Sequence, residues 1–233
     1  MLRLTNKIFF PLPDFADDEG LLAVGGDLSP SRLLCAYRMG IFPWYEEGYP
    51  ILWWSPDPRA VLFPQDFHLS KRSARRIRKA GFEIRADTAF EQVIRRCATI
   101  RGPRREGTWI TSEMLQAYCR LHELGYAHSF ETWLEGRLVG GLYGVSLGAC
   151  FFGESMFSEV SEASRAALAR LVDCAKSWQF LFIDCQLRND HLMRLGAREI
   201  SRRSFLKLLE EALRVHPTRQ GRWTEAVAAV SDE

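Results

Sequence analysis

Three polar side chains that come just beyond aromatic residues are the best candidates for chemistry in this sequence. Glu154 follows the run CFFG, and Asp184 and Gln186 lie within FLFIDCQ at 180–186. Burying carboxylates and amides costs free energy unless they are hydrogen-bonded. Acids at the mouth of an apolar pocket can exchange protons with a substrate, and a neutral amide can orient one. The residues equally allow a pair of hydrogen-bonded structural acids.

The stretch 180–187 is expected to be a β-strand, whose side chains alternate between two faces. One face carries the polar pair, and its members are Phe180, Phe182, Asp184 and Gln186. The other face is uniformly apolar and typical of core, and its members are Leu181, Ile183, Cys185 and Leu187. Ile183 and Asp184 therefore point to opposite sides, so they can serve one pocket only if the strand twists or bulges.

Several common catalytic motifs are incomplete. GESMF lacks the last glycine of GxSxG, HELGYAH spaces its histidines too widely for a zinc-binding HExxH, and GGDLSP lacks the lysine of a phosphate-binding loop. Cys185 near His191 would allow a thiol nucleophile, but its position on the apolar face argues against this reading. With no motif for a metal or cofactor, an enzyme of this sequence would work with side chains alone.

Residues 69–81 are expected to form a basic amphipathic helix that is capped by Ser70 and ends at Gly81. Six cations of one sign cover most of it: Lys71, Arg72, Arg75, Arg76, Arg78 and Lys79. A further arginine cluster lies at 101–105. Phosphate contacts need clustered Lys and Arg without base reading, so these residues predict a nucleic-acid surface, with a solvated helix face as the alternative.

Four tryptophans, at 44, 53, 54 and 109, lie near loop signals rather than in helical stripes. They are candidates for core packing or, at a loop edge, for stacking on a base.

The order of the expected elements is helix, helix, three strands, helix, strand and helix, which indicates an α+β fold with a mostly antiparallel sheet. The three strands lie in 127–157, and the final helix, 201–214, leaves a polar tail. Residues 1–62, rich in Pro, Gly and Trp, are expected to form a small N-terminal α+β domain with one helix at 29–40. Residues 63–233 would then form the larger domain.

The composition is that of an ordinary globular protein, with 233 residues, 47% hydrophobic and 26% charged residues and a net charge of +2. Six scattered cysteines without a CxxC pair favour reduced thiols and a cytoplasmic location. The sequence contains no apolar run long enough for a transmembrane helix and no signal-peptide pattern, so no membrane association is expected.

Several segments resemble the leucyl/phenylalanyl-tRNA–protein transferase family. They include GLLAVGGDLSPSRLLCAYRMGIFPWY, ILWWSPDPRAVLFP, EGTWIT, VGGLYGV, FFGESMFS and FIDCQLRNDHLMRLGAREISRR, in this order between about residues 20 and 205. The resemblance implies an acetyltransferase-like larger domain and transfer of Leu or Phe, with Met a further candidate, from aminoacyl-tRNA to proteins beginning with Arg or Lys. Such transfer marks the acceptor for N-degron proteolysis. The pyrophosphate loop of acetyl-CoA enzymes, Q/R-x-x-G-x-G/A, is absent, which argues against that cofactor.

The resemblance also implies roles for particular residues. Asp184, Gln186 and Glu154 would form the polar catalytic centre. The pocket for the donor side chain would be lined by Phe151, Met156, Leu142, Leu171 and Ile183. Trp44 and Trp109 would hold the 3′-terminal adenosine of the tRNA. Where the family often has Met, this chain has Leu142, whose side chain is less adaptable.

The implied reaction is the aminolysis of an ester, which needs neither ATP nor metal because the ester is already activated. Gln186 would accept a hydrogen bond from the incoming amine, and either Asp184 or Glu154 would handle its proton. Two alternatives remain at this point: a related transferase that uses another aminoacyl-tRNA, and a non-catalytic tRNA-binding module.

Overall fold

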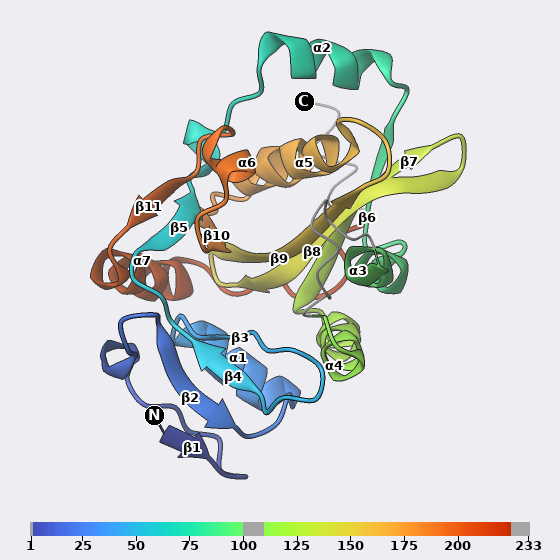
Figure 1. Ribbon diagram of the computed structural model, residues 1–233. Coiled ribbons are helices and arrows are strands. Elements are labelled where there is room, and N and C mark those ends of the chain that lie inside the picture. The colour runs from blue at the N-terminus through green and yellow to red at the C-terminus, as the bar shows by residue number, and fades with distance from the viewer. Residues whose placement is uncertain (1, 100–109, 225–233) are drawn as a thin grey trace.

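The computed structural model describes residues 2–99 and 110–224, which are arranged around two β-sheets (Figure 1). The smaller sheet has the order β1-β2-β4-β3, with bounds Leu2–Leu4, Leu21–Gly25, Leu52–Trp54 and Phe42–Pro43. Helix α1, Pro30–Arg38, contacts β3 of this sheet and buries Leu33, Ala36 and Tyr37. Trp53 is fully buried here, so it belongs to the core rather than to a stacking surface.

The larger sheet has seven strands in the order β11-β5-β10-β9-β8-β7-β6. In that order the bounds are Arg198–Ile200, Arg59–Leu62, Phe182–Gln186, Cys150–Ser158, Arg137–Leu147, Ala127–Leu134 and Glu83–Ala86. Neighbouring strands are antiparallel except β9 and β10, which run parallel. The predicted α+β class with a mostly antiparallel sheet is confirmed.

Helices cover both faces of the larger sheet (Figure 1). Helix α5, Ala163–Ser177, packs on one face. Three helices pack on the other, namely α3, Phe90–Thr99, α4, Ser112–Glu123, and α7, Arg202–Val215. The shorter helices are α2, Lys71–Lys79, α6, Asp190–Met193, and the 3₁₀ turns Pro13–Phe15 and Pro64–Asp66. In the described residues, no helix is long and apolar enough to cross a membrane.

Glycines in β8 allow α5 and β9 to approach this strand closely. A Cβ on Gly140 would lie 2.5 Å from the Cβ of Ala163, at the start of α5. A Cβ on Gly144 would lie 2.1 Å from the backbone oxygen of Phe152, in β9. Larger residues at these two positions would push α5 and β9 away from β8. The glycines of the segment VGGLYG therefore determine how closely the elements that support the site can pack.

The structure departs from the sequence predictions in three places. Strand β5 precedes the proposed boundary at residue 62 but pairs with β10 and β11 of the larger sheet. Strand β11 lies in a stretch where no strand was expected. The C-terminal tail is not merely polar, because Trp223 is buried and its ring stacks on His128 at 3.6 Å between centroids.

Candidate active site

Two β-bulges interrupt the neighbouring strands β9 and β10. On β9, Gly153 and Ser155 oppose consecutive residues of β8, so Glu154 is the extra residue. On β10, Asp184 and Gln186 oppose consecutive residues of β5, so Cys185 is the extra residue. Pairing between β9 and β10 ends at Asp184 and Phe152. Beyond that point the two strands separate, because bulges bend a strand and re-aim its side chains.

A cavity of about 420 Å³ lies where the strands separate. This volume falls within the range of small-molecule sites. Every residue that the sequence assigned to the donor pocket lines it: Phe151, Met156, Leu142, Leu171 and Ile183. Glu154, Asp184, Gln186 and Trp44 also contribute to its wall. The fold thus brings these positions together from β3–β4, β8, β9, α5 and β10, and it adds walls that the sequence did not single out, among them Leu62, Leu168 and Leu192.

Asp184 carries a carboxylate that is sealed within the protein. Arg59 Nε donates to Asp184 Oδ1 at 2.9 Å, and Arg59 Nη2 donates to Oδ2 at 2.7 Å. The side chain of Asp184 is 0% exposed, and that of Arg59 is 1% exposed. A two-point arginine contact of this kind fixes a carboxylate in place. Asp184 is therefore placed to position other groups rather than to touch a substrate.

Gln186 has a left-handed backbone conformation with φ 55°. Its N–H donates to Asp184 Oδ1 at 3.0 Å, and Leu187 N–H donates to the Cys185 carbonyl at 2.7 Å, which makes Gln186 the centre of a tight turn. Such turns are strained for residues other than glycine, so the surrounding contacts must hold them. The turn brings Gln186 to the cavity that Ile183 also lines, although strict alternation puts these two residues on opposite faces. The bulge follows Asp184, so it does not change the alternation between Ile183 and Asp184.

The Gln186 side chain ends inside the protein. Its Nε2 atom is buried and has no hydrogen-bond partner among the described residues. A buried polar group in this state is costly unless a ligand satisfies it. Gln186 is accordingly suited to contact a bound substrate.

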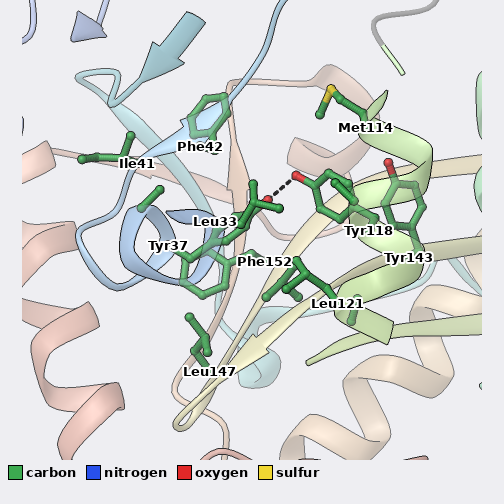
Figure 2. Close-up of a cluster of buried hydrophobic side chains, with 14 of the residues drawn as sticks. Leu33, Tyr37, Ile41, Phe42, Met114, Tyr118, Leu121, Tyr143, Leu147 and Phe152 are labelled. Carbon is green, nitrogen blue, oxygen red and sulfur yellow. Dashed lines mark hydrogen bonds between the residues drawn. The ribbon is translucent and has the colours of Figure 1, made fainter. Parts of the chain in front are cut away.

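Glu154 binds two tyrosines that sequence reasoning missed, and Figure 2 shows the hydrogen bond between the hydroxyls of these tyrosines. Tyr37 in α1 donates to Glu154 Oε1 at 2.7 Å, and Tyr118 in α4 donates to Oε2 at 3.0 Å. The two tyrosine hydroxyl oxygens are 2.5 Å apart. Each of the three pairs among Tyr37, Tyr118 and Glu154 needs one proton to form a hydrogen bond, but the two tyrosine hydroxyls supply only two protons. The ring of hydrogen bonds is complete when Glu154 carries the third proton.

Burial dominates the electrostatics of this cluster. It raises the pKa of Glu154 from 4.5 to about 7, and the nearby charge of Asp184 adds to the rise, while the hydrogen bonds from Tyr37 and Tyr118 oppose it. Burial and the charge of Glu154 raise the pKa of Tyr37 and of Tyr118 well above 10. Glu154 is thus a proton-binding group on the cavity wall whose pKa lies close to neutral pH.

The basic helix α2 forms as predicted, with Ser70 accepting a hydrogen bond from Ser73 N–H as its cap. All six cations are exposed. Arg76 lies 3.6 Å from Glu162 at the start of α5. Arg165 in α5 reaches both Ser73 of α2 and His191 of the cavity wall, each at 3.5 Å. The predicted phosphate-binding surface therefore adjoins the α5 side of the cavity.

Two predicted features lie outside the described residues, namely Trp109 and the arginine cluster at 101–105. Trp44, the other residue expected to hold adenosine, lines the cavity and is 41% exposed, while Trp54 Nε1 donates to its carbonyl at 2.7 Å.

Cys185 lines the cavity too, but burial raises the pKa of its thiol far above 9, which disfavours the nucleophilic thiolate. All six cysteines are free.

Comparison with known proteins identifies the family of the chain. A family model described as "Leucyl/phenylalanyl-tRNA protein transferase" matches residues 61–210, and the model of the N-terminal domain of the same family matches residues 26–57. The chain belongs to this family. It is therefore an aminoacyltransferase.

Curated relatives carry the same family name. The transferase is 57% identical to the leucyl/phenylalanyl-tRNA–protein transferase of Anaeromyxobacter sp. (strain Fw109-5), over 95% of this chain and 94% of that protein. It is 55% identical to the one of Legionella pneumophila (strain Lens), over 92% and 96%. Among solved structures, a GCN5-related N-acetyltransferase from Kribbella flavida is 9% identical with a TM-score of 0.34, covering 77% of this chain and 63% of that chain.

The raised pKa of Glu154 makes the stability of the transferase depend on pH. Between pH 4.5 and about 7 the folded state keeps a proton that the unfolded chain releases, so this group lowers the free energy of unfolding as pH rises. We expect Glu154→Gln to be more stable than the wild type at pH 8 by about 3 kcal/mol, and this gain to vanish near pH 4. Urea unfolding at both pH values measures this difference in the free energy of unfolding, with Glu46→Gln at an exposed position as the control. An equal difference between Glu154→Gln and the wild type at both pH values would contradict the raised pKa of Glu154.

Proposed function

We propose that the transferase moves Leu or Phe from aminoacyl-tRNA to the N-terminal amine of proteins that begin with Arg or Lys. The observation that carries the proposal is the cavity, where the family's donor-pocket positions and polar centre meet. This reaction serves N-degron proteolysis, and we place it in the cytoplasm, where charged tRNA and acceptor proteins meet. A division into an N-terminal domain and a catalytic domain remains part of the proposal, with the boundary better placed in the turn before β5 than at residue 62.

The donor side chain would occupy the apolar end of the cavity between β8, β9 and α5. Its walls are aliphatic and aromatic side chains, which distinguish donors by size and shape rather than by hydrogen bonds. A pocket of this kind separates substrates by only about 1–3 kcal/mol per methylene. Leu and Phe would therefore be preferred over β-branched donors through shape, and Met would be a weaker donor. Trp44, at the mouth, would hold the terminal adenosine.

The reaction requires one proton to leave the attacking amine. The amine nitrogen attacks the ester carbonyl carbon, the bond to the ribose oxygen breaks, and the ribose oxygen takes a proton. Gln186 would orient the amine and the ester, with its backbone held by Asp184. Glu154 would receive the amine proton, because its pKa is close to neutral and its tyrosine ring is complete when it is protonated. Most of the acceleration would come from holding both substrates together.

The tRNA body would lie on α2. Its six exposed cations offer phosphate contacts that carry no sequence information, which suits an enzyme that takes its specificity from the amino acid. The contacts of Arg165 with Ser73 of α2 and with His191 of the cavity wall support this proposal, because they link α2 to the cavity that would receive the charged 3′ end.

A transfer assay tests the proposal directly. Leu-, Phe-, Met- and Ile-tRNA, each labelled on the amino acid, are offered to peptides beginning with Arg, Lys or Ala. We expect transfer of Leu and Phe to the Arg and Lys peptides, weaker transfer of Met, and little of Ile. Gln186→Ala should reduce the single-turnover rate by about 10²-fold, whereas the exposed Gln65→Ala should not. Absence of Leu and Phe transfer by the wild type would overturn the proposed function.

A further inference from the structure

Arg59 is a fully buried arginine at the junction of the two sheets. It is the first residue of β5, and its guanidinium lies between the rings of Phe42 and Phe205, 4.8 Å and 4.5 Å from their centroids. Burying a guanidinium is costly unless its donors are satisfied. Arg59 donates hydrogen bonds to two partners. Its Nε and Nη2 donate to the Asp184 carboxylate, and its Nη1 donates to the Gly40 carbonyl at 3.2 Å.

Each of these partners is linked to different residues that line the cavity. Asp184 accepts a hydrogen bond from the N–H of Gln186, a residue with a strained backbone that lines the cavity. Gly40 follows α1, which carries Tyr37, and precedes Phe42 and Trp44, which also line the cavity. One planar side chain thus fixes the distance between the Gln186 turn and the segment 40–44 that comes from the smaller sheet.

We propose that Arg59 is a positioning residue for the transfer reaction, which sets the Gln186 turn and the Trp44 wall against each other. The inference rests on the proposed roles of Gln186 and Trp44. A lysine cannot replace Arg59, because an ammonium is a point charge and lacks the fork that contacts two carboxylate oxygens and a carbonyl together. Asp184 positions only the Gln186 turn, because the hydrogen bond to Gly40 of the segment 40–44 comes from Arg59.

These contacts predict different kinetic effects for the two partners. Arg59→Lys should lower kcat by about 10²-fold and also raise KM for aminoacyl-tRNA, because both walls lose their anchor. Asp184→Asn keeps an acceptor for the Gln186 N–H but loses the ionic partner, so it should lower kcat with little change in KM. The control is Arg32→Lys, which alters a buried arginine of α1 that binds Thr5, Lys7 and Asp27 away from the cavity. It should change thermal stability but neither kinetic constant.

Two further measurements separate positioning from folding. Arg59→Met combined with Asp184→Asn leaves no lone buried charge, so the fold should survive while kcat stays low. Millimolar guanidinium chloride should restore part of the kcat of Arg59→Ala, and equal urea or sodium chloride should not. The inference is overturned if the double variant transfers at the wild-type rate, or if Arg59 and Arg32 variants lose activity only in proportion to stability. An inactive wild type would instead refute the proposed function.

Discussion

Glu154→Gln is expected to lower the rate of Leu transfer by about 10²–10⁴-fold at pH 8, the range typical of a lost general base. Above pH 7 the wild-type carboxylate is ionised and can accept the amine proton, whereas the amide cannot. The wild-type kcat should fall as pH decreases through about 7, and the variant should lose this dependence. Single-turnover rates from pH 5.5 to 8.5, with one Arg-initiated peptide, measure both effects.

Other titrating groups must be separated from Glu154 in this experiment. His191 lines the cavity, and burial together with Arg165 lowers its pKa below 6.5, so His191→Asn is measured in parallel and should retain the dependence near pH 7. Glu46→Gln, on an exposed loop, serves as the matched charge control. If Glu154 instead binds the basic side chain of the acceptor, Glu154→Gln will abolish the preference for Arg over citrulline and leave kcat and its pH dependence intact.

Reversing two charges on α2 should weaken tRNA binding strongly while leaving the chemistry unchanged. Arg72→Glu with Arg75→Glu removes two exposed cations and spares Arg76, which contacts Glu162. We expect KM for Leu-tRNA to rise at least tenfold, with kcat at saturation within a factor of about two. The slope of log affinity against log salt should fall by about 0.7–0.9 for each lost phosphate contact.

A second double variant carries the same change in net charge on other elements. Arg137→Glu with Arg214→Glu alters exposed arginines at the start of β8 and near the end of α7. If α2 is the tRNA surface, this variant should retain nearly wild-type KM and salt dependence. Equal losses in both double variants would show that overall charge, rather than the helix, attracts tRNA.

Local sequence patterns predicted most of the elements because their signals are local. Ser70 caps α2, the glycine-containing turns EGR and SLG join β7, β8 and β9, and apolar periodicity marks α5. The pattern did not reveal β11, which is short and largely exposed, nor the burial of Trp223. Trp223 reaches the core only because Asp87 and His128, more than 90 residues earlier, hold its backbone and ring.

The candidate site was also partly predictable. The sequence singled out the acid and the amide after an aromatic run, Asp184 and Gln186, and both line the cavity, while the resemblance proposed their roles. Strict alternation nevertheless placed Asp184 and Gln186 on one face, because a bulge cannot be read from residue types alone. Arg59 offered one signal, a charge at the head of the apolar strand RAVL, but only its contact with Asp184 gives that signal a meaning.

The sequence by itself determined which residue types are available: an apolar set for the donor, one amide, two acids and a basic helix. The tertiary structure decided how differently the two acids are held. Asp184 is buried and paired with Arg59, while Glu154 accepts hydrogen bonds from two tyrosines that lie 117 and 36 positions away along the chain. Protonation depends on burial and on neighbouring donors, and both arise only when distant segments pack together.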